Sequence, residues 1–300
     1  MVTGYLHPQY AESLSEFGTP RELPGCGGWI LERQIPEFPD RDAMGCYPIF
    51  VCQDWSQLAL DLQDLDDLVS LALVTDPFGE YDEAYLHRCF DVVLPFKEHY
   101  IVDLQRPINE IVSRHHRYYA RKASENVHIE ICKEPIRYVD EWAALYTALS
   151  DRHSVTGVRA FSRTAFVKQL SIPGLVMFRA TYRGTAVGAA LCFVQKDVAY
   201  GHLMGINEVG HELGVSYALY WSHLPYLSDK VRWLDWGGTS GVQNRDRDGL
   251  SQFKRGWSTG TRTAYFCGKV INQERYAALV EAKAPPETKY FPPYRSGEMA

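Results

Sequence analysis

The spacing of apolar and polar residues divides the second half of the chain into a regular series of strands and helices. Alternating positions predict strands, and apolar residues three and four positions apart predict helices. Short turns at Arg183-Gly184 and Lys196-Asp197 predict that three of the strands form an antiparallel meander. The predicted elements are strand 127–133, helices 138–153 and 162–170, strands 175–183, 185–195 and 198–206, helix 215–227, strand 231–238, short helix 250–255, strand 264–271 and helix 273–282.

The first half of the chain has a weaker pattern. Residues 1–45 are rich in proline and glycine and predict loops and short strands. Strands are expected at 47–52, 68–75 and 100–104, and helices at 55–65, 83–90 and 108–123. The acids at 61, 64, 66 and 67 are interpreted as a solvated helix face, and no metal site is expected.

Composition restricts the class of protein. The 300 residues, 46% hydrophobic and 23% charged, are enough for one large domain or two ordinary ones. No window has the ~18 consecutive apolar residues of a membrane helix, so no membrane span is expected. Seven cysteines without a C-x-x-C pair, and an N-terminus without a secretion signal, predict a cytoplasmic protein with reduced thiols.

The predicted helix at 108–123 has a basic polar face. Its charged and histidine side chains are Arg114, His115, His116, Arg117, Arg121 and Lys122. One interpretation is a solvated helix face, and the other is a surface that attracts a phosphate-bearing ligand. Because the net charge is −6, any nucleic-acid partner must be held by such a local patch.

The order strand, two helices, three strands, helix, strand, helix, strand across 127–271 resembles the GCN5-related acyltransferase (GNAT) fold. In that fold a glycine-containing donor loop precedes the helix that follows the meander. Gly214 matches this loop, whereas His211 and Ser216 depart from its usual residues. Free backbone N–H groups at the start of that helix could meet an anion.

Three segments together resemble the Fem family of aminoacyl-tRNA-dependent transferases. They are the basic helix with strands 101–104 and 127–131, residues 213–219 leading to 234–238, and 249–257. The last, Gly-Leu-Ser-Gln-Phe-Lys-Arg-Gly-Trp, looks like the family's Phe-Lys-x-Gly-aromatic segment. The resemblance implies an α/β protein of tandem GNAT-like lobes, with mixed central sheets flanked by helices and a cleft between the lobes. We expect lobes at 1–124 and 125–300.

Several residues are candidates for the chemistry of acyl transfer. By resemblance and position, Lys254 is expected to stabilise the oxyanion, and the alternative is an exposed helix lysine. Asp235 and His202 are candidate bases, with buried structural roles as alternatives. The other candidates are Gly214, Ser216, Tyr217, Phe253 and Arg255 for the donor, Arg159 and Asp76 for the acceptor, and Arg245, Arg247 and Arg262 with Arg255 as a basic rim.

The resemblance implies transfer of an aminoacyl group from aminoacyl-tRNA to an amine of a small metabolite, peptide or cell-wall precursor. No cofactor is expected beyond the donor substrate. The second hypothesis is an N-acyltransferase that uses acyl-CoA or a carrier-protein thioester. The third hypothesis is a protein with a transferase fold that only binds nucleotide or RNA. The pathway could be peptidoglycan or natural-product biosynthesis.

Overall fold

The computed structural model describes residues 1–238, 249–285, 288 and 290–296. The chain forms two compact units, each built from three separate stretches. Unit 1 contains Met1–His7, Lys97–Val155 and Phe161–Thr263, and unit 2 contains Pro8–Phe96, Thr156–Ala160 and Ala264–Ala300. This division differs from the expected boundary between residues 124 and 125. Residues 97–124 belong to the unit of the C-terminal half, and residues 264–300 belong to the other unit.

Unit 1 is organised around a mixed sheet with the strand order β5-β10-β9-β8-β7-β6. The strands β6 to β9 form an antiparallel meander, β10 is parallel to β9, and β5 is antiparallel to β10. The strand bounds are β5 Val92–Asp103, β6 His128–Cys132, β7 Leu175–Tyr182, β8 Thr185–Gln195, β9 Val198–Ile206 and β10 Trp233–Asp235.

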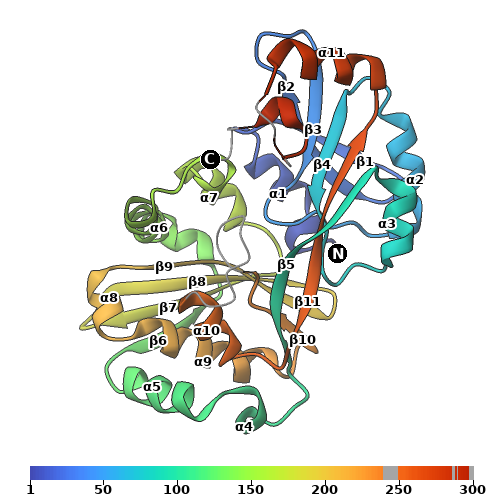
Figure 1. The fold of residues 1–300 in the computed structure, drawn as a ribbon. Helices are drawn as coiled ribbons and strands as arrows, with labels where there is room; N and C mark the ends of the chain where they lie inside the picture. The colour runs from blue at the N-terminus through green and yellow to red at the C-terminus, as the bar shows by residue number, and fades with distance from the viewer. Residues whose placement is uncertain (239–248, 286–287, 289, 297–300) are drawn as a thin grey trace. The chain divides into compact units, whose positions relative to one another are not determined.

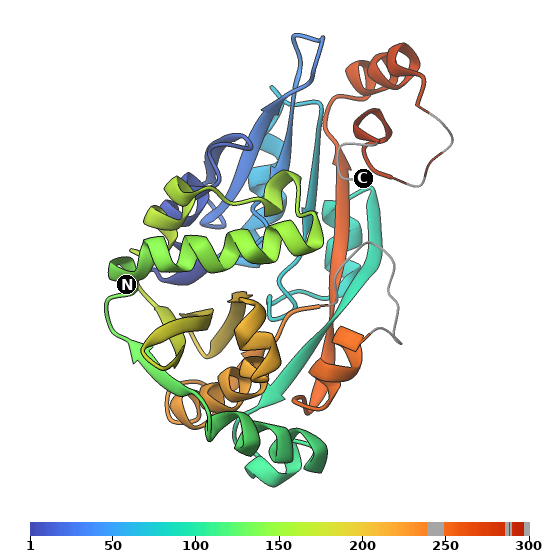
Figure 2. The ribbon, with the colours of Figure 1, turned by 90° about the vertical axis from the view of Figure 1, so that its left-hand side faces the viewer.

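Helices cover both faces of this sheet (Figures 1 and 2). On one face α9 (Val215–Leu227) packs on the strands and α5 (Arg114–Ser124) packs on α9. On the other face lie α6 (Val139–His153) and α7 (Arg163–Gln169), and Leu145 of α6 approaches Gly205 so closely that a Cβ there would be 3.0 Å away. Shorter helices are α4 (Ile108–Ile111), α8 (Glu208–Glu212) and α10 (Gly249–Arg255).

In unit 2 the strands follow the order β1-β2-β3-β4-β11. Strands β3 and β4 are parallel, and the other pairs are antiparallel. The bounds are β1 Thr19–Leu23, β2 Gly28–Gln34, β3 Arg41–Gly45, β4 Ser70–Val74, β11 Gly260–Val270, α1 Pro8–Ser13, α2 Leu58–Asp61, α3 Glu83–Cys89 and α11 Gln273–Lys283.

A buried ion pair ties the C-terminal segment to the sheet of unit 2. Arg295 donates to both carboxylate oxygens of Asp42 at 2.8 and 2.9 Å, and Asp42 is 0% exposed. Arg33 lies 3.2 Å from the same carboxylate. Removing either Arg295 or Asp42 would leave an uncompensated buried charge and is therefore expected to destabilise unit 2 strongly.

The pattern of the second half is confirmed: every predicted strand and helix from β6 to α11 is present within a few residues. Three expectations of local structure are corrected. The predicted strand at 47–52 is no strand and makes only the bridge Phe50 to Thr75. The predicted helix at 108–123 is split into α4 and α5, because Ser113 caps α5 by accepting from His116 N. The expected loop at 209–214 contains α8, capped by Asn207.

Within the described residues, no helix is long and apolar enough to cross a membrane. All seven cysteines are buried and none forms a disulfide. Burial removes water from the thiolate form, which raises the pKa of Cys46 to about 12.

Candidate active site

The end of β10 lies between two strands of unit 1. Strand β10 pairs with β9 only from Trp233 to Asp235. Beyond Asp235 the chain bonds to β5 instead, with Trp236 N donating to Tyr100 O at 2.9 Å and Tyr100 N donating to Gly237 O at 3.3 Å. Strand β9 continues alongside β8 to Ile206, so the pairing of the two parallel strands β9 and β10 ends at Asp235.

The two side chains at this end point to opposite faces of the sheet. Trp236 stacks on Tyr220 of α9 with ring centroids 4.0 Å apart. Asp235, its neighbour, is 2% exposed, and its Oδ2 lies 2.7 Å from Nδ1 of His99. The other carboxylate oxygen accepts from Gly237 N at 2.7 Å. Alternation along the strand therefore directs the carboxylate away from α9 and toward β5.

His99 and Asp235 form a buried histidine–carboxylate pair. A carboxylate only accepts hydrogen bonds, so Nδ1 of His99 is the donor, and in the neutral ring Nε2 carries the lone pair. In the part of the chain that the structure describes, Nε2 has no hydrogen-bond partner. A carboxylate that orients the imidazole and stabilises its protonated form is what general-base catalysis needs. Sequence reasoning missed His99 because Pro95, Lys97 and Glu98 interrupt the apolar pattern, so the strand was predicted only from residue 100 onward.

Lys254 lies beside this pair, at the C-terminal end of α10. Its Nζ donates to Gly238 O at 2.6 Å and to Gly237 O at 3.2 Å, and the residue is only 8% exposed. A Cβ on Gly238 would lie 3.4 Å from Cδ2 of His99. The ammonium, the two glycines and the His99–Asp235 pair therefore form one cluster. This burial does not fit the alternative in which Lys254 is an exposed helix lysine.

Tyr217 and Phe253 come together in an aromatic group on the α5–α9 face. Their ring centroids are 5.0 Å apart, and each ring lies 5.4 Å from His116. Tyr217 also stacks on Tyr119 of α5 at 5.3 Å. Burial, and next to it the neighbouring His115, lower the pKa of His116, so its imidazole is neutral in this group.

His202 is separate from the His99–Asp235 pair in its bonding. Tyr5 Oη lies 3.1 Å from its Nδ1 and Gln169 Oε1 lies 3.2 Å from its Nε2. Desolvation lowers its pKa to about 3, so the ring is neutral at physiological pH. With both ring nitrogens bonded, this geometry fits the structural interpretation better than that of a base.

The candidate donor loop leads into α9. Gly214, with φ of 68°, is the N-cap of the helix and uses the left-handed region that favours glycine. Ser216 lies half-buried in the first turn of α9, and Arg255 is exposed at the end of α10. The start of α9 therefore presents backbone N–H groups and a hydroxyl together.

The two acceptor candidates belong to unit 2. Asp76 is 4% exposed, and its Oδ1 accepts from Phe78 N at 2.9 Å, which is the geometry of a turn. Arg159 is exposed and lines a pocket of about 450 Å³ with Arg33 and Arg295. Of the basic rim, Arg262 lies over the Trp233 ring at 5.1 Å, whereas Arg245 and Arg247 lie outside the described residues.

Among the residues that the structure describes, no three histidine, cysteine or acidic side chains are grouped as metal ligands.

This arrangement of strands and helices defines an acyltransferase fold of the GNAT type. Residues 112–255 match the model of the acetyltransferase (GNAT) domain. The match contains α5, α9, Asp235 and Lys254 but not His99. A comparison with curated protein sequences found no match.

Solved structures agree with this fold over nearly the whole chain. FemX has a TM-score of 0.64 at 12% identity, covering 90% of this chain and 92% of that chain. The C-terminal domain of an Agrobacterium fabrum protein described as a lysylphosphatidylglycerol synthetase has a TM-score of 0.62 at 14% identity, with 92% and 91% covered. L-PGS from Bacillus licheniformis has a TM-score of 0.60 at 14% identity, with 95% and 97% covered. The predicted α/β fold of Fem-like, tandem GNAT proteins is confirmed.

Proposed function

We propose that this protein is an aminoacyltransferase that forms an amide bond between the aminoacyl group of an aminoacyl-tRNA and an amine acceptor. The observation that carries the proposal is the buried cluster of Lys254, the Gly237–Gly238 carbonyls and the His99–Asp235 pair inside the GNAT-type unit. The fold shared with FemX supports a donor of this class.

In the proposed reaction the acceptor amine attacks the ester carbonyl carbon of the donor. His99 takes the proton of the attacking nitrogen at Nε2, and Asp235 stabilises the imidazolium that forms. The carbon–oxygen bond to the terminal ribose then breaks, and His99 returns the proton to the departing ribose hydroxyl. The products are an amide and deacylated tRNA, and the enzyme ends in its starting state.

Lys254 supplies the positive charge of the cluster. Negative charge develops on the former carbonyl oxygen during attack, and a fixed cation or donor in such a site is worth about 3–4 kcal/mol. Because two of its three N–H groups are directed at Gly237 O and Gly238 O, the ammonium is held in one orientation before substrate binds. We propose that this fixed charge stabilises the oxyanion.

The remaining candidates have proposed substrate roles. Gly214 and Ser216 at the start of α9, with Tyr217, Phe253 and Arg255, would contact the donor. Arg159 and Asp76 of unit 2 would contact the acceptor, with Arg159 offering a guanidinium for a carboxylate or phosphate. His202 is the second choice as base, since both of its ring nitrogens are bonded.

A second candidate function is N-acyl transfer from acyl-CoA or a carrier-protein thioester. It is favoured by the match of residues 112–255 to an acetyltransferase domain and by Gly214 at the donor-loop position. The chemistry of the cluster is the same for both donors, because an ester and a thioester develop the same oxyanion. The donor must therefore be identified by experiment.

The test is consumption of donor by the purified protein. Mixed aminoacyl-tRNAs, acetyl-CoA and longer acyl-CoAs are offered with amine acceptors, and loss of the ester or thioester is measured. Phosphatidylglycerol vesicles are included as an acceptor, since one similar structure is the C-terminal domain of a protein named as a putative lysylphosphatidylglycerol synthetase. Deacylation of tRNA that depends on an acceptor supports the proposal, whereas consumption of acyl-CoA alone replaces it with the second candidate.

The role of the lysine is tested separately. Lys254→Met keeps the length of the side chain but removes the charge, so we expect transfer to fall by about 10²–10³-fold. Thermal unfolding and circular dichroism of the variant check that the fold is retained. A folded Lys254→Met variant that transfers at the wild-type rate would remove Lys254 from the mechanism.

A further inference from the structure

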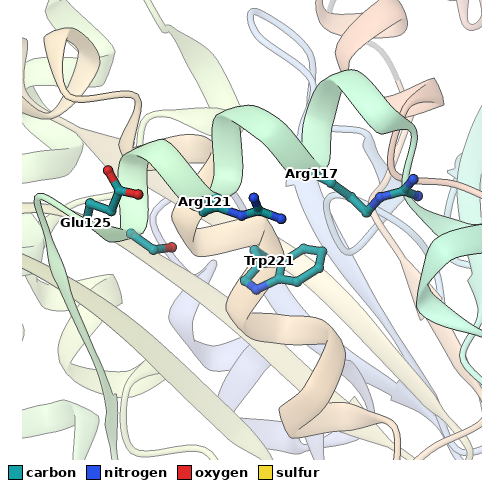
Figure 3. A pocket seen from close by; sticks show the side chains of 5 residues that line it. Arg117, Arg121, Glu125 and Trp221 are labelled. Atoms are coloured by element: carbon teal, nitrogen blue, oxygen red, sulfur yellow. The ribbon is translucent and has the colours of Figure 1, made fainter.

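A pocket lies on the α5–α9 face of unit 1. It has a volume of about 330 Å³ and is lined by Arg117, Arg121 and Ser124 of α5, by Glu125, the C-cap residue of α5, and by Trp221 of α9. The α5 residues are spaced so that one stripe of the helix faces the pocket. Figure 3 shows Arg117, Arg121 and Glu125 following one another along α5, with the Trp221 indole beside Arg121.

Two side chains of this pocket have groups without a polar or ring partner among the described residues, although Trp221 also packs against the hydrophobic core of unit 1. The Arg121 guanidinium is exposed and makes no hydrogen bond or ion pair with any described residue, although Glu125, the C-cap of α5, is four residues away. The Trp221 ring has no aromatic or hydrogen-bond partner in the described part of the chain. Arg117 is held in place through Nη1, which donates to Asn109 O and Val112 O at 2.9 and 2.5 Å.

Positive and negative side chains lie at opposite ends of the pocket. Arg117 and Arg121 occupy one end and the middle, and Glu125 occupies the other end (Figure 3). An anionic group is therefore stabilised at the arginine end and repelled from the glutamate end. Hydroxyl groups can donate to Glu125 or bond to Ser124, and a flat ring can stack on the exposed face of Trp221. A ribonucleotide combines these three chemistries in one molecule.

We propose that this pocket binds one nucleotide of a single-stranded RNA segment. The base stacks on Trp221, the phosphate lies at Arg121 and Arg117, and the 2′-hydroxyl of the ribose donates to Glu125. The inference rests on the proposed function, to which it adds a contact for the donor tRNA outside the His99–Lys254 cluster.

An RNA strand is favoured over a free nucleotide because the basic surface extends past the pocket. Helix α5 has four cationic side chains and no acid within its 11 residues, in a chain with a net charge of −6. Tyr118 and Tyr119 beside them are 61% and 39% exposed. Cations interleaved with exposed aromatic rings are typical of surfaces that track a single strand.

The experiment measures binding of a tRNA, a 12-nucleotide single-stranded RNA and the DNA of the same sequence. Trp221→Leu is expected to weaken RNA binding by about 5–100-fold, and Trp221→Phe to retain most of it. Arg121→Gln is expected to weaken binding and to reduce the slope of log K against log salt by about 1. Glu125→Gln is expected to reduce the preference for RNA over DNA, because the 2′-hydroxyl is what distinguishes them.

Arg152→Gln is the matched control. Arg152 is an exposed cation of α6, on the opposite face of the sheet, and has no bonded partner among the described residues. The same loss of charge there is expected to leave RNA affinity unchanged. If Arg152→Gln lowered RNA affinity as much as Arg121→Gln, binding would depend only on the overall charge of the protein. That result would overturn the proposal that RNA binds in this pocket.

The outcomes separate this inference from the proposed function. If wild type and Trp221→Leu bind RNA with equal affinity, the proposed nucleotide pocket is overturned, whereas the proposed aminoacyl transfer is not. Binding of AMP or coenzyme A at Trp221 without RNA binding overturns the assignment to a strand. Absence of transfer from aminoacyl-tRNA, combined with Trp221-dependent RNA binding, would overturn the proposed function alone. Loss of affinity in the pocket variants with unchanged turnover at saturating tRNA supports both.

Discussion

His99 and Asp235 are 136 residues apart in sequence and 2.7 Å apart in space. Asp235 was recognisable as a candidate because it stands at the end of an apolar strand before two glycines. His99 was not, because the pattern predicted β5 only from Tyr100 onward, whereas the strand begins at Val92. A hydrogen bond between strands depends on register, and register between distant strands is not encoded in the local pattern.

The first prediction concerns this pair. Asp235→Asn and His99→Gln are each expected to lower kcat/KM for transfer by about 10²-fold or more, because one orients and stabilises the other. Residues that act as a unit show non-additive losses, so the double variant should be little worse than either single one. Multiplied losses in the double variant, with all three proteins folded, would contradict a shared role.

The second prediction concerns stability in acid. His223 is 1% exposed and stacks on Phe178 at 3.7 Å, and burial lowers its pKa from 6.5 to about 4. Between these values the unfolded state binds a proton that the folded state does not. The free energy of unfolding should therefore fall as pH is lowered from about 6.5 to 4, by at most roughly 1.4 kcal/mol per pH unit from this group.

His223→Gln removes the titrating group and keeps a side-chain N–H donor. Denaturant unfolding measured from pH 7 to pH 4 should have a shallower dependence on pH in this variant. A variant whose stability changes with pH as steeply as that of the wild type would show that His223 is not buried as a neutral group.

At the scale of elements, the local pattern predicted most strands and helices of the segment that matches the GNAT model, but few of the connections between them. Strands β6 to β9 and helices α6, α7 and α9 follow clear periodicities, and they are present as predicted. Where one element ends and the next begins depends on caps and side-chain contacts, which the periodicity of apolar residues does not predict. Ser113 divides the basic helix, and Asn207 starts α8 inside a segment whose glycines predicted a loop.

The third prediction compares two glycines at the joint of α8 and α9. Gly214 has φ of 68°, but a Cβ would find its nearest neighbours at 3.8 and 3.9 Å. Gly214→Ala should therefore cost only about 1 kcal/mol of backbone strain. A Cβ on Gly210 would lie 2.1 Å from the Val187 carbonyl oxygen, so Gly210→Ala must displace backbone and should cost several times more.

Denaturant unfolding of the two glycine variants gives the comparison. Gly249→Ala is a suitable control, because nothing lies within 4 Å of its added Cβ and its backbone is not left-handed. A larger loss for Gly214→Ala than for Gly210→Ala would contradict the packing between α8 and β8 described above.

At the scale of the whole molecule, the sequence predicted two α/β lobes but placed their boundary along the chain rather than in space. The structure divides the chain into interleaved stretches, with residues 97–124 in unit 1 and residues 264–300 in unit 2. Long-range strand pairing decides this division. β10 needs β5 as its antiparallel partner, and β4 needs β11.

The fourth prediction follows from that division. A fragment of residues 125–300 leaves β10 without β5 and α9 without α5, which exposes core residues such as Leu219 and Trp257. It should aggregate or unfold without a cooperative transition, whereas a fragment of residues 97–263 should keep near-UV circular dichroism typical of packed aromatic residues. Cooperative unfolding of 125–300 with that spectrum would mean that β5 and α5 are dispensable.

The interleaving also fixes an order of events during protein synthesis. All stretches of unit 1 are present once residue 263 has left the ribosome, but β4 pairs with β11, which ends later, and Asp42 pairs with Arg295, 253 residues further along the chain. The unit that contains most of the early residues is thus the last to be completed. The nascent chain must carry an unfinished sheet from the synthesis of Asp42 until that of Arg295, at ~5–20 residues per second, which makes the access of chaperones to this sheet part of how the molecule is made.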